Sequence, residues 1–315
     1  MTYNHENYIR DAIESVLMQV TNFEYELLIG EDCSTDDTMR IVEEYAQKHP
    51  DKIRVITSEH NVGARENSVR LHSESIGKYV AICEGDDYWL DPYKLQKQVD
   101  YLEANPDCTF CFHNAYLVRG TNKDTDTKRS LIKKDNNYFS KDKTKFNAGE
   151  LALFGFIPTS SFIYRRELMD HPPNWYYSAV VRDNSLKLIT TSHGYAHFID
   201  ENLGVYRIEV KDSIMDKWKK EGNTKEKQIE RNKGFVELLD NFNEYSKYKY
   251  DNEIKQAKIP FEVLNLGLEG NKKKLKSSEY KEYIGSMNMK QRIIFKGNIH
   301  FPKSLALLVK VKSLL

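Results

Sequence analysis

The sequence has no excess of either charge and few cysteines, and both absences exclude classes of protein. Lysine and arginine number 47, aspartate and glutamate also number 47, and the formal net charge of the 315 residues is therefore zero. A chain without a basic excess lacks the electrostatic footprint of a nucleic-acid-binding protein, so we expect no nucleic acid partner. Four cysteines are too few for a disulfide framework in a chain of this length, which favours the reducing cytoplasm as its location.

Long hydrophobic runs are also missing. No stretch approaches the roughly 20 consecutive apolar residues that a membrane-spanning helix needs. The segment from Pro302 to Leu315 alternates leucines with lysines and has the pattern of a short basic amphipathic helix. Two interpretations of it stay open. In the first, which we favour, the helix packs on the rest of the protein, because most apolar helix faces of this kind belong to a protein core. In the second, it makes a peripheral contact with the inner face of the membrane.

Strand and helix patterns alternate through the N-terminal third of the chain. The segment Glu6 to Val20 places its apolar residues on one face of a helix, and apolar runs at 25–29, 53–56 and 79–83 have the length of buried strands. Helical patterns separate these runs. Such alternation predicts an α/β fold with a mostly parallel, Rossmann-like sheet and helices on both faces, in which ligands bind at the carboxyl ends of the strands.

The composition changes near residue 212. Before it, strand and helix patterns continue, with a helix predicted from about Asp183 to Ser192 and strands near 195–199 and 203–206. Beyond it, lysine and glutamate rise, and successive helices are predicted. We therefore assign residues 1–211 to the α/β domain and residues 212–315 to a helical C-terminal extension.

Acidic residues gather where two of the predicted strands end. Asp32 follows the first apolar run, where its carboxylate can accept a hydrogen bond from the ring N–H of a pyrimidine base, and its alternative role is to cap a helix. Glu84, Asp86 and Asp87 follow the run 79–83, and they repel one another unless a cation is bound. Mg²⁺ and Mn²⁺ prefer oxygen ligands and often use one or two carboxylates together with phosphate oxygens. Asp87 has the alternative of capping the turn.

These clusters belong to a longer set of motifs that resembles the family-2 inverting glycosyltransferases of the GT-A fold. The motifs occur in the family's order and spacing over about residues 2–105, and a weaker match continues to about Arg207. The resemblance implies that residues 1–211 are a GT-A catalytic domain. The matching segments are Thr2-Tyr3-Asn4-His5-Glu6-Asn7-Tyr8-Ile9, Asp32-Cys33-Ser34-Thr35-Asp36-Asp37-Thr38, Asn61-Val62-Gly63, Glu84-Gly85-Asp86-Asp87-Tyr88-Trp89 and Asp91-Pro92-Tyr93-Lys94-Leu95.

The resemblance implies roles for individual residues in binding a nucleotide sugar. Tyr3 would stack on the base, Asp32 would bond to it, and Asp86 would be the metal ligand of the family's DxD motif. Glu84 takes the place of the first Asp of that motif, which weakens the expectation that it contacts the diphosphate-ribose part. Arg65 could steady the diphosphate as a bidentate donor, and it could equally be a solvated arginine on a helix face.

The same resemblance places the catalytic base at the start of a helix, where Asp183 is the candidate. A general base must reach the nucleophilic hydroxyl directly or through one water. Arg182 occupies the place of the acidic partner often found there. The alternative for Asp183 is a structural role as the N-cap of the helix that follows it.

The implied reaction is the transfer of a sugar, with inversion, from a nucleoside-diphosphate sugar to an acceptor hydroxyl, with Mn²⁺ or Mg²⁺ as cofactor. UDP is the expected nucleotide, and the expected acceptor is a glycan or lipid-linked sugar in bacterial surface polysaccharide synthesis. A nucleotidyltransferase is one alternative, although such enzymes have a glycine-rich phosphate loop that is missing near the start of this sequence. A catalytically inactive sugar-binding module is the other, because fold does not determine activity.

The first predicted helix has no strand before it. A βαβ unit would feed the helix from a buried strand of about five residues, but only Met1, Thr2 and Tyr3 precede the turn. We therefore expect the first strand to be missing, because the chain is either truncated or begins at a misassigned start. A sheet without an inner strand leaves buried backbone groups unpaired, each at about 1–3 kcal/mol, and removes the rigid support of Tyr3.

Overall fold

The described part of the chain forms two compact units. The computed structural model describes residues 1–121, 129–132, 142–211, 213, 216, 224–287, 289, 292–293 and 295. The first unit comprises Met1–Tyr177 and Arg182–Ser213, and the second comprises Ser178–Val181 and Ile214–Leu315. The assignment of 1–211 and 212–315 as separate domains stays a proposal.

The N-terminal part of the first unit alternates helices and strands as predicted. Strands β1 and β2 pair in parallel, with Leu27 opposite Ile53. Ile9 and Ile13 of α1 are buried and belong to the same apolar cluster as Ile29 of β1, because their helical spacing places them on one face. The elements are α1 (Ile9–Leu17), β1 (Leu27–Gly30), α2 (Thr38–Lys48), β2 (Ile53–Ile56), α3 (Gly63–Glu74) and β3 (Tyr79–Ala81).

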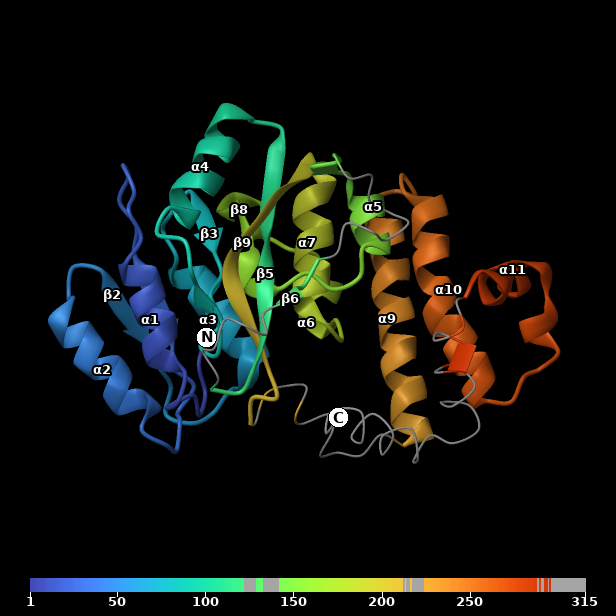
Figure 1. Cartoon of the computed structure of the whole chain (residues 1–315), viewed down its shortest axis with the longest axis horizontal. Coiled ribbons are helices and arrows are strands. Elements are labelled where there is room, and N and C mark those ends of the chain that lie inside the picture. The colour runs from blue at the N-terminus through green and yellow to red at the C-terminus, as the bar shows by residue number, and fades with distance from the viewer. Residues whose placement is uncertain are drawn as a thin grey trace. The chain divides into compact units, whose positions relative to one another are not determined.

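The second sheet is mixed, and its longest strands, β5 and β9, lie side by side in parallel (Figure 1). The strand order is β3-β8-β5-β9-β4, with β6 paired to β5 and β7 paired to β9. The remaining elements of the first unit are β4 (Tyr88–Trp89), α4 (Lys94–Ala104), β5 (Cys108–Arg119), β6 (Arg129–Ser130), β7 (Lys145–Phe146), α5 (Ala148–Leu153), η1 (Thr159–Ser161), β8 (Ile163–Arg165), η2 (Arg166–Met169), α6 (Trp175–Ser178), α7 (Arg182–Ser192) and β9 (Tyr195–Ile208).

The predicted α/β class is confirmed, and the second sheet also contains antiparallel strand pairs. Among the described strands, β1–β2 and β5–β9 pair in parallel and the other pairs are antiparallel, so the first sheet is parallel and the second is mixed. Strands of two or three residues such as β4 and β8 carry too little pattern to predict which neighbour they join or in which direction. The parallel pairing inferred from the alternating strands and helices of the first hundred or so residues could therefore not be extended to the later strands.

Aromatic side chains of β5 form the centre of the second sheet's core. Phe110 and Phe112 are fully buried. The ring of Phe110 lies 4.8 Å from that of Phe162, and the ring of Phe112 lies 5.1 Å from that of Phe198 on β9. This packing fixes β9 against β5 and so fixes where the end of β9 meets the site described below.

An apolar groove, called here the β1–β3 groove, separates β1 from β3. Within the described residues each of these strands has one partner, β2 for the first and β8 for the second. The groove has a volume of about 760 Å³, and Leu27 and Val80 are among its lining residues. Thr2 lies beside β1, because its N–H donates to the carbonyl of Gly30 at 2.9 Å and it forms a parallel bridge with Glu31. The missing inner strand stays a prediction, and the groove is a place where such a strand would fit.

The second unit is helical, as predicted for the C-terminal region. Its described helices are α9 (Lys225–Tyr245), α10 (Asp251–Leu268) and α11 (Ser278–Ser286), with the short turn η3 (Lys274–Lys276). Phe235 of α9 and Phe261 of α10 stack with ring centroids 4.7 Å apart. Within the described ranges, no helix has the length and hydrophobicity needed to cross a bilayer. The basic amphipathic segment 302–315 lies outside the described residues.

Candidate active site

A tight loop, residues 82–87, joins β3 to β4 and carries the predicted acidic motif. The N–H of Gly85 donates to the carbonyl of Met1 at 2.8 Å. A β-carbon at Gly85 would lie only 2.8 Å from that same oxygen, so a glycine is needed here. On the other side, Nη1 of Arg207 donates to the carbonyl oxygen of Asp86 at 2.8 Å. The main chain of the loop is therefore held at two successive residues.

The two aspartates of the loop have different environments. Asp87 is 1% exposed, and its Oδ1 accepts a hydrogen bond of 2.8 Å from the backbone N–H of Arg207. Burial, together with repulsion from Asp86, raises the pKa of Asp87 well above its usual range. Asp86 is half-buried, and within the described residues its carboxylate makes no hydrogen bond or ion pair. Asp87 thus has a structural position, and Asp86 remains the candidate ligand-binding carboxylate.

Glu84 and Asp183 share the electrostatic environment of Asp86. Desolvation raises the pKa of Glu84 to about 7, and the charges of Asp86 and Asp183 raise it while the α-ammonium group of Met1 lowers it. Two segments that are distant in the sequence, the acidic loop and the start of α7, thus contribute carboxylates to one electrostatic environment. Carboxylates that repel one another in this way favour a bound proton or cation near neutral pH.

Asp183 lies in the first turn of α7. Its Oδ1 accepts from the N–H of Asn184 at 2.7 Å, and its Oδ2 accepts from the hydroxyl of Thr159 at 3.1 Å. Because α7 begins at Arg182, Asp183 is inside the helix and not at the N-cap position that was its alternative role. A negative charge in the first turn is favoured by the helix dipole. Each oxygen keeps a second lone-pair position for an incoming hydroxyl.

The side chain of Arg182 is directed toward α3 and not toward the adjacent Asp183. Its Nη1 donates to the carbonyl of Arg65 at 2.5 Å and to the hydroxyl of Ser68 at 2.8 Å, and its guanidinium lies 4.4 Å from the ring centroid of Tyr176. Arg182 therefore ties α7 to α3, a role that differs from that of an acidic partner. Arg65 is exposed at the start of α3, and its contact with a diphosphate stays a prediction.

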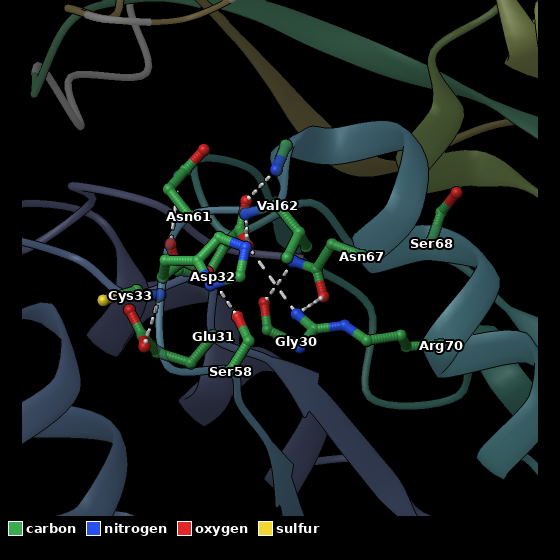
Figure 2. A network of polar contacts seen from close by, with 12 residues as sticks. Gly30, Glu31, Asp32, Cys33, Ser58, Asn61, Val62, Asn67, Ser68 and Arg70 are labelled. Atoms are coloured by element: carbon green, nitrogen blue, oxygen red, sulfur yellow. Dashed lines mark hydrogen bonds and ion pairs between the residues drawn. The ribbon is translucent and has the colours of Figure 1, made fainter.

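Asp32 joins the end of β1 to the start of α3, as Figure 2 shows. It is 2% exposed, and its two carboxylate oxygens accept from the N–H groups of Val62 at 2.9 Å and Gly63 at 2.8 Å. Arg70 lies 3.6 Å from Oδ1, and the side chain of Asn61 donates to the carbonyl of Asp32 at 3.0 Å. The helix-capping alternative is thus present, at α3, and the fixed carboxylate still has lone pairs for a base N–H.

The segment that carries Tyr3 is anchored to the loop after β1. The N–H of Asp32 donates to the carbonyl of Thr2 at 3.1 Å, and the N–H of Asn4 donates to the hydroxyl of Ser34 at 3.0 Å. Asn4 has a φ of 54°, which turns the chain before α1 begins. Tyr3, half-buried between these anchors, is therefore on the same sheet edge as Asp32. Its stacking on a base stays a prediction.

Sequence reasoning missed two residues of β9. Burial, followed by the charges of Asp87, Asp86, Asp183 and Glu84, raises the pKa of the Tyr206 hydroxyl above its usual range, so this phenol lies among the acidic residues. Arg207 binds the acidic loop through side chain and main chain. The sequence did contain an indication for Arg207, which is an arginine within an apolar strand pattern. A buried charge needs a nearby partner, so such an arginine indicates an ion pair.

One divalent cation shared with a ligand fits the acidic loop. Within the described ranges no group of three or more His, Cys, Asp or Glu side chains is arranged to hold a metal ion. Mg²⁺ is often held by one or two carboxylates, and phosphate and water supply the remaining ligands. Asp86, whose carboxylate makes no bond to the described protein, matches that pattern. A closed, all-protein metal site does not fit these residues.

Comparisons with known proteins identify relatives of the N-terminal half. Residues 1–171 match the model of "Glycosyl transferase family 2". An uncharacterised protein of Mycobacterium tuberculosis (strain ATCC 25618 / H37Rv) is 38% identical over 168 residues, which cover 53% of this chain and 46% of that protein. TuaG of Bacillus subtilis, provisionally named a teichuronic acid biosynthesis glycosyltransferase, is 36% identical over 117 residues, covering 37% of this chain and 45% of TuaG.

The fold is similar to that of solved glycosyltransferases. TarS 1-349 of S. aureus, in complex with UDP-GlcNAc, matches with a TM-score of 0.57 and 16% identity over 92% of this chain and 75% of that one. At this identity the likeness shows the fold alone. The matched segments span less than half the length of the curated relatives given above.

Proposed function

Because this chain belongs to glycosyl transferase family 2, we propose that it transfers a sugar from a nucleoside-diphosphate sugar to an acceptor hydroxyl, with inversion at the anomeric carbon. The observation that carries the proposal is the shared electrostatic environment of Glu84 and Asp86, from the acidic loop, and Asp183, from the start of α7. A metal-binding carboxylate and a general base must lie on either side of one anomeric carbon, and this grouping is compatible with that need.

In the proposed reaction Asp183 is the general base. It accepts the proton of the acceptor hydroxyl as that oxygen forms a bond to the anomeric carbon, while the bond from this carbon to the diphosphate oxygen breaks. Thr159, which donates to Oδ2, keeps the carboxylate oriented. Asp86 would hold Mg²⁺ or Mn²⁺, which supplies charge stabilisation to the departing nucleoside diphosphate.

Tyr3 and Asp32 are the proposed contacts to the base, with UDP as the proposed nucleotide. TarS, which has a similar fold, was solved with UDP-GlcNAc, and this supports the choice of UDP without deciding the sugar. The name of TuaG supports an acceptor in a cell-surface polysaccharide, either a glycan or a lipid-linked sugar. We propose that Arg65 assists at the diphosphate and that the reaction takes place in the cytoplasm, at the inner face of the membrane if the segment 302–315 contacts lipid.

The test is the variant Asp86→Asn, which removes a negative charge and changes the side-chain volume little. We expect it to abolish Mn²⁺-dependent release of UDP from a panel of UDP-sugars while the melting temperature of the ligand-free protein is maintained. Asp37→Asn is the matched control, because Asp37 is exposed and pairs only with Arg40 among the ion pairs of the described residues. Activity of Asp86→Asn close to wild type in Mn²⁺-replete buffer would contradict the assignment of Asp86.

The same assay separates the two alternatives. A nucleotidyltransferase would release pyrophosphate from UTP and a sugar phosphate and would leave UDP-sugars intact. A catalytically inactive sugar-binding module would be stabilised by UDP-sugars in thermal melts but would release no UDP.

A further inference from the structure

A buried arginine lies directly behind the acidic loop. Arg207 of β9 is 3% exposed, and its Nη2 makes an ion pair of 2.6 Å with Asp11 of α1. Nη1 of the same guanidinium donates to the carbonyl of Asp86 at 2.8 Å, and the backbone N–H of Arg207 donates to Asp87 at 2.8 Å. One residue thus connects α1, the acidic loop and β9.

Two tyrosine rings enclose this guanidinium. Its central carbon lies 4.5 Å from the ring centroid of Tyr88 and 5.3 Å from that of Tyr8. The rings exclude water from the arginine and restrict its movement, and they interact favourably with its charge. Asp11 and the Asp86 carbonyl then accept from the two terminal nitrogens at once, a geometry that the planar fork of arginine allows and the single amine of lysine does not.

The positive charge of Arg207 lies next to the main chain of Asp86 and not next to its carboxylate. The guanidinium binds the carbonyl of Asp86, and the carboxylate of Asp86 makes no bond within the part of the chain described. An arginine paired with that carboxylate would compete with a metal ion for it. Asp11 instead takes up the charge of Arg207, so the loop is held without neutralising its ligand group.

A purely structural role explains this arrangement less well. A buried ion pair is often no more stabilising than well-packed apolar side chains of similar volume, since desolvation offsets much of the attraction. An apolar residue at 207 could fill the space but could not bind the Asp86 carbonyl. The feature that only the pair Arg207–Asp11 provides is the fixed orientation of the peptide from which the Asp86 side chain extends.

We propose that Arg207 and Asp11 are positioning residues, which orient the carboxylate of Asp86 toward the divalent cation. The inference rests on the proposed function, because it takes Asp86 as the metal ligand. Arg207 sets the direction of the Asp86 peptide, and Asp11 sets the direction of the guanidinium. Neither residue is expected to touch the cation or the sugar donor.

The test compares Arg207→Lys and Asp11→Asn with a matched control, Arg165→Lys. Arg165 of β8 also binds backbone carbonyls, those of Leu102 at 2.8 Å and Cys108 at 3.0 Å. It lies opposite Tyr79, at the end of β3 that is remote from the acidic loop. Binding of Mn²⁺ in the presence of UDP is measured by electron paramagnetic resonance of free Mn²⁺, and stability is measured by thermal melts.

We expect Arg207→Lys and Asp11→Asn each to weaken Mn²⁺ binding in the presence of UDP by about 10- to 100-fold, as is usual for residues that orient a metal ligand. Arg165→Lys should lower the melting temperature and leave Mn²⁺ affinity unchanged. Saturating Mn²⁺ should restore UDP release by Arg207→Lys but not by Asp86→Asn, because only the latter lacks the ligand.

Wild-type Mn²⁺ affinity in folded Arg207→Lys and Asp11→Asn would overturn the proposal, and so would an equal loss of affinity in Arg165→Lys. If Arg207→Lys does not fold, Asp11→Asn decides alone. Asp86→Asn separates this inference from the proposed function. Undiminished Mn²⁺ affinity in Asp86→Asn means that the metal assignment itself is wrong, whereas a loss confined to Asp86→Asn leaves that assignment intact and refutes the positioning role.

Discussion

The β1–β3 groove predicts that an apolar segment joined ahead of Met1 stabilises the first unit. Both strands that border the groove have one partner among the described residues, and the lining is rich in apolar side chains such as Leu28 and Ile82. Thr2 already pairs in parallel with Glu31, so residues placed before it would enter the groove alongside β1. The perturbation is an N-terminal extension of five β-branched residues, which have high strand propensity.

The size of the effect follows from the geometry of the groove. A five-residue strand between two edges can form roughly six backbone hydrogen bonds, each worth about 1 kcal/mol net. Burying roughly three of its side chains adds about 2 kcal/mol each, and ordering the segment costs about 1.5 kcal/mol per residue. The balance is a stabilisation of about 4.5 kcal/mol. For a domain of this size that corresponds to an increase in melting temperature of about 9–18 °C.

The assay is a thermal melt of the 315-residue chain and of the extended chain, each with and without UDP and Mn²⁺. A second extension of equal length, with proline at alternate positions, is the control, because proline cannot donate to a strand ladder. We expect only the first extension to raise the melting temperature. It should also increase the shift produced by UDP, because Tyr3 gains a rigid support. Equal melting points and equal ligand shifts for the three proteins would refute the strand interpretation.

Three further changes probe buried charges and the base. Asp183→Asn should lower UDP release about 10²–10⁴-fold with little change in UDP affinity, and unchanged turnover would exclude Asp183 as the base. Burial lowers the pKa of Lys94 to about 7, and its amine has no hydrogen-bond partner in the described structure. Lys94→Met should therefore raise the melting temperature most below pH 7, and this gain should shrink as the pH rises toward 10. Desolvation raises the pKa of Glu84 to about 7, so stability in metal-free buffer should fall as pH rises through 7, and Glu84→Gln should remove that fall in melts at pH 5 and 8.

The parts of the fold that could be predicted are those whose pattern lies within one element. Ile9 and Ile13 lie on one helical face of α1, and a run such as 27–30 has the length of a buried strand, so local spacing was enough. Strand direction in the second sheet depends on partners far along the chain. The strand β8 pairs with β3 and β5, and three residues contain no signal for that choice.

The site was predictable to the extent that its residues are contiguous motifs. Glu84 and Asp86 follow a predicted strand, so the sequence pattern alone pointed to them, whereas Asp183 was named through the family resemblance. Arg207 could not be identified from the sequence, because its role depends on an ion pair with Asp11, which is 196 positions away in the sequence. A helix-capping role was the alternative for Asp32, but the sequence did not indicate which helix, and the structure places this contact at α3, through Val62 and Gly63.

The distribution of charge around Asp86 predicts that the proposed donor binds together with a cation. A diphosphate is an anion, the chain has no net positive charge to attract it, and the acidic loop repels it. The guanidinium of Arg207 is bound to Asp11 and a carbonyl, and that of Arg182 is bound to a carbonyl and a hydroxyl of α3. Neither arginine is therefore available to a diphosphate in this arrangement. A divalent cation at Asp86 would reverse the local charge, so donor affinity should follow the concentration of the cation more closely than any single arginine contact.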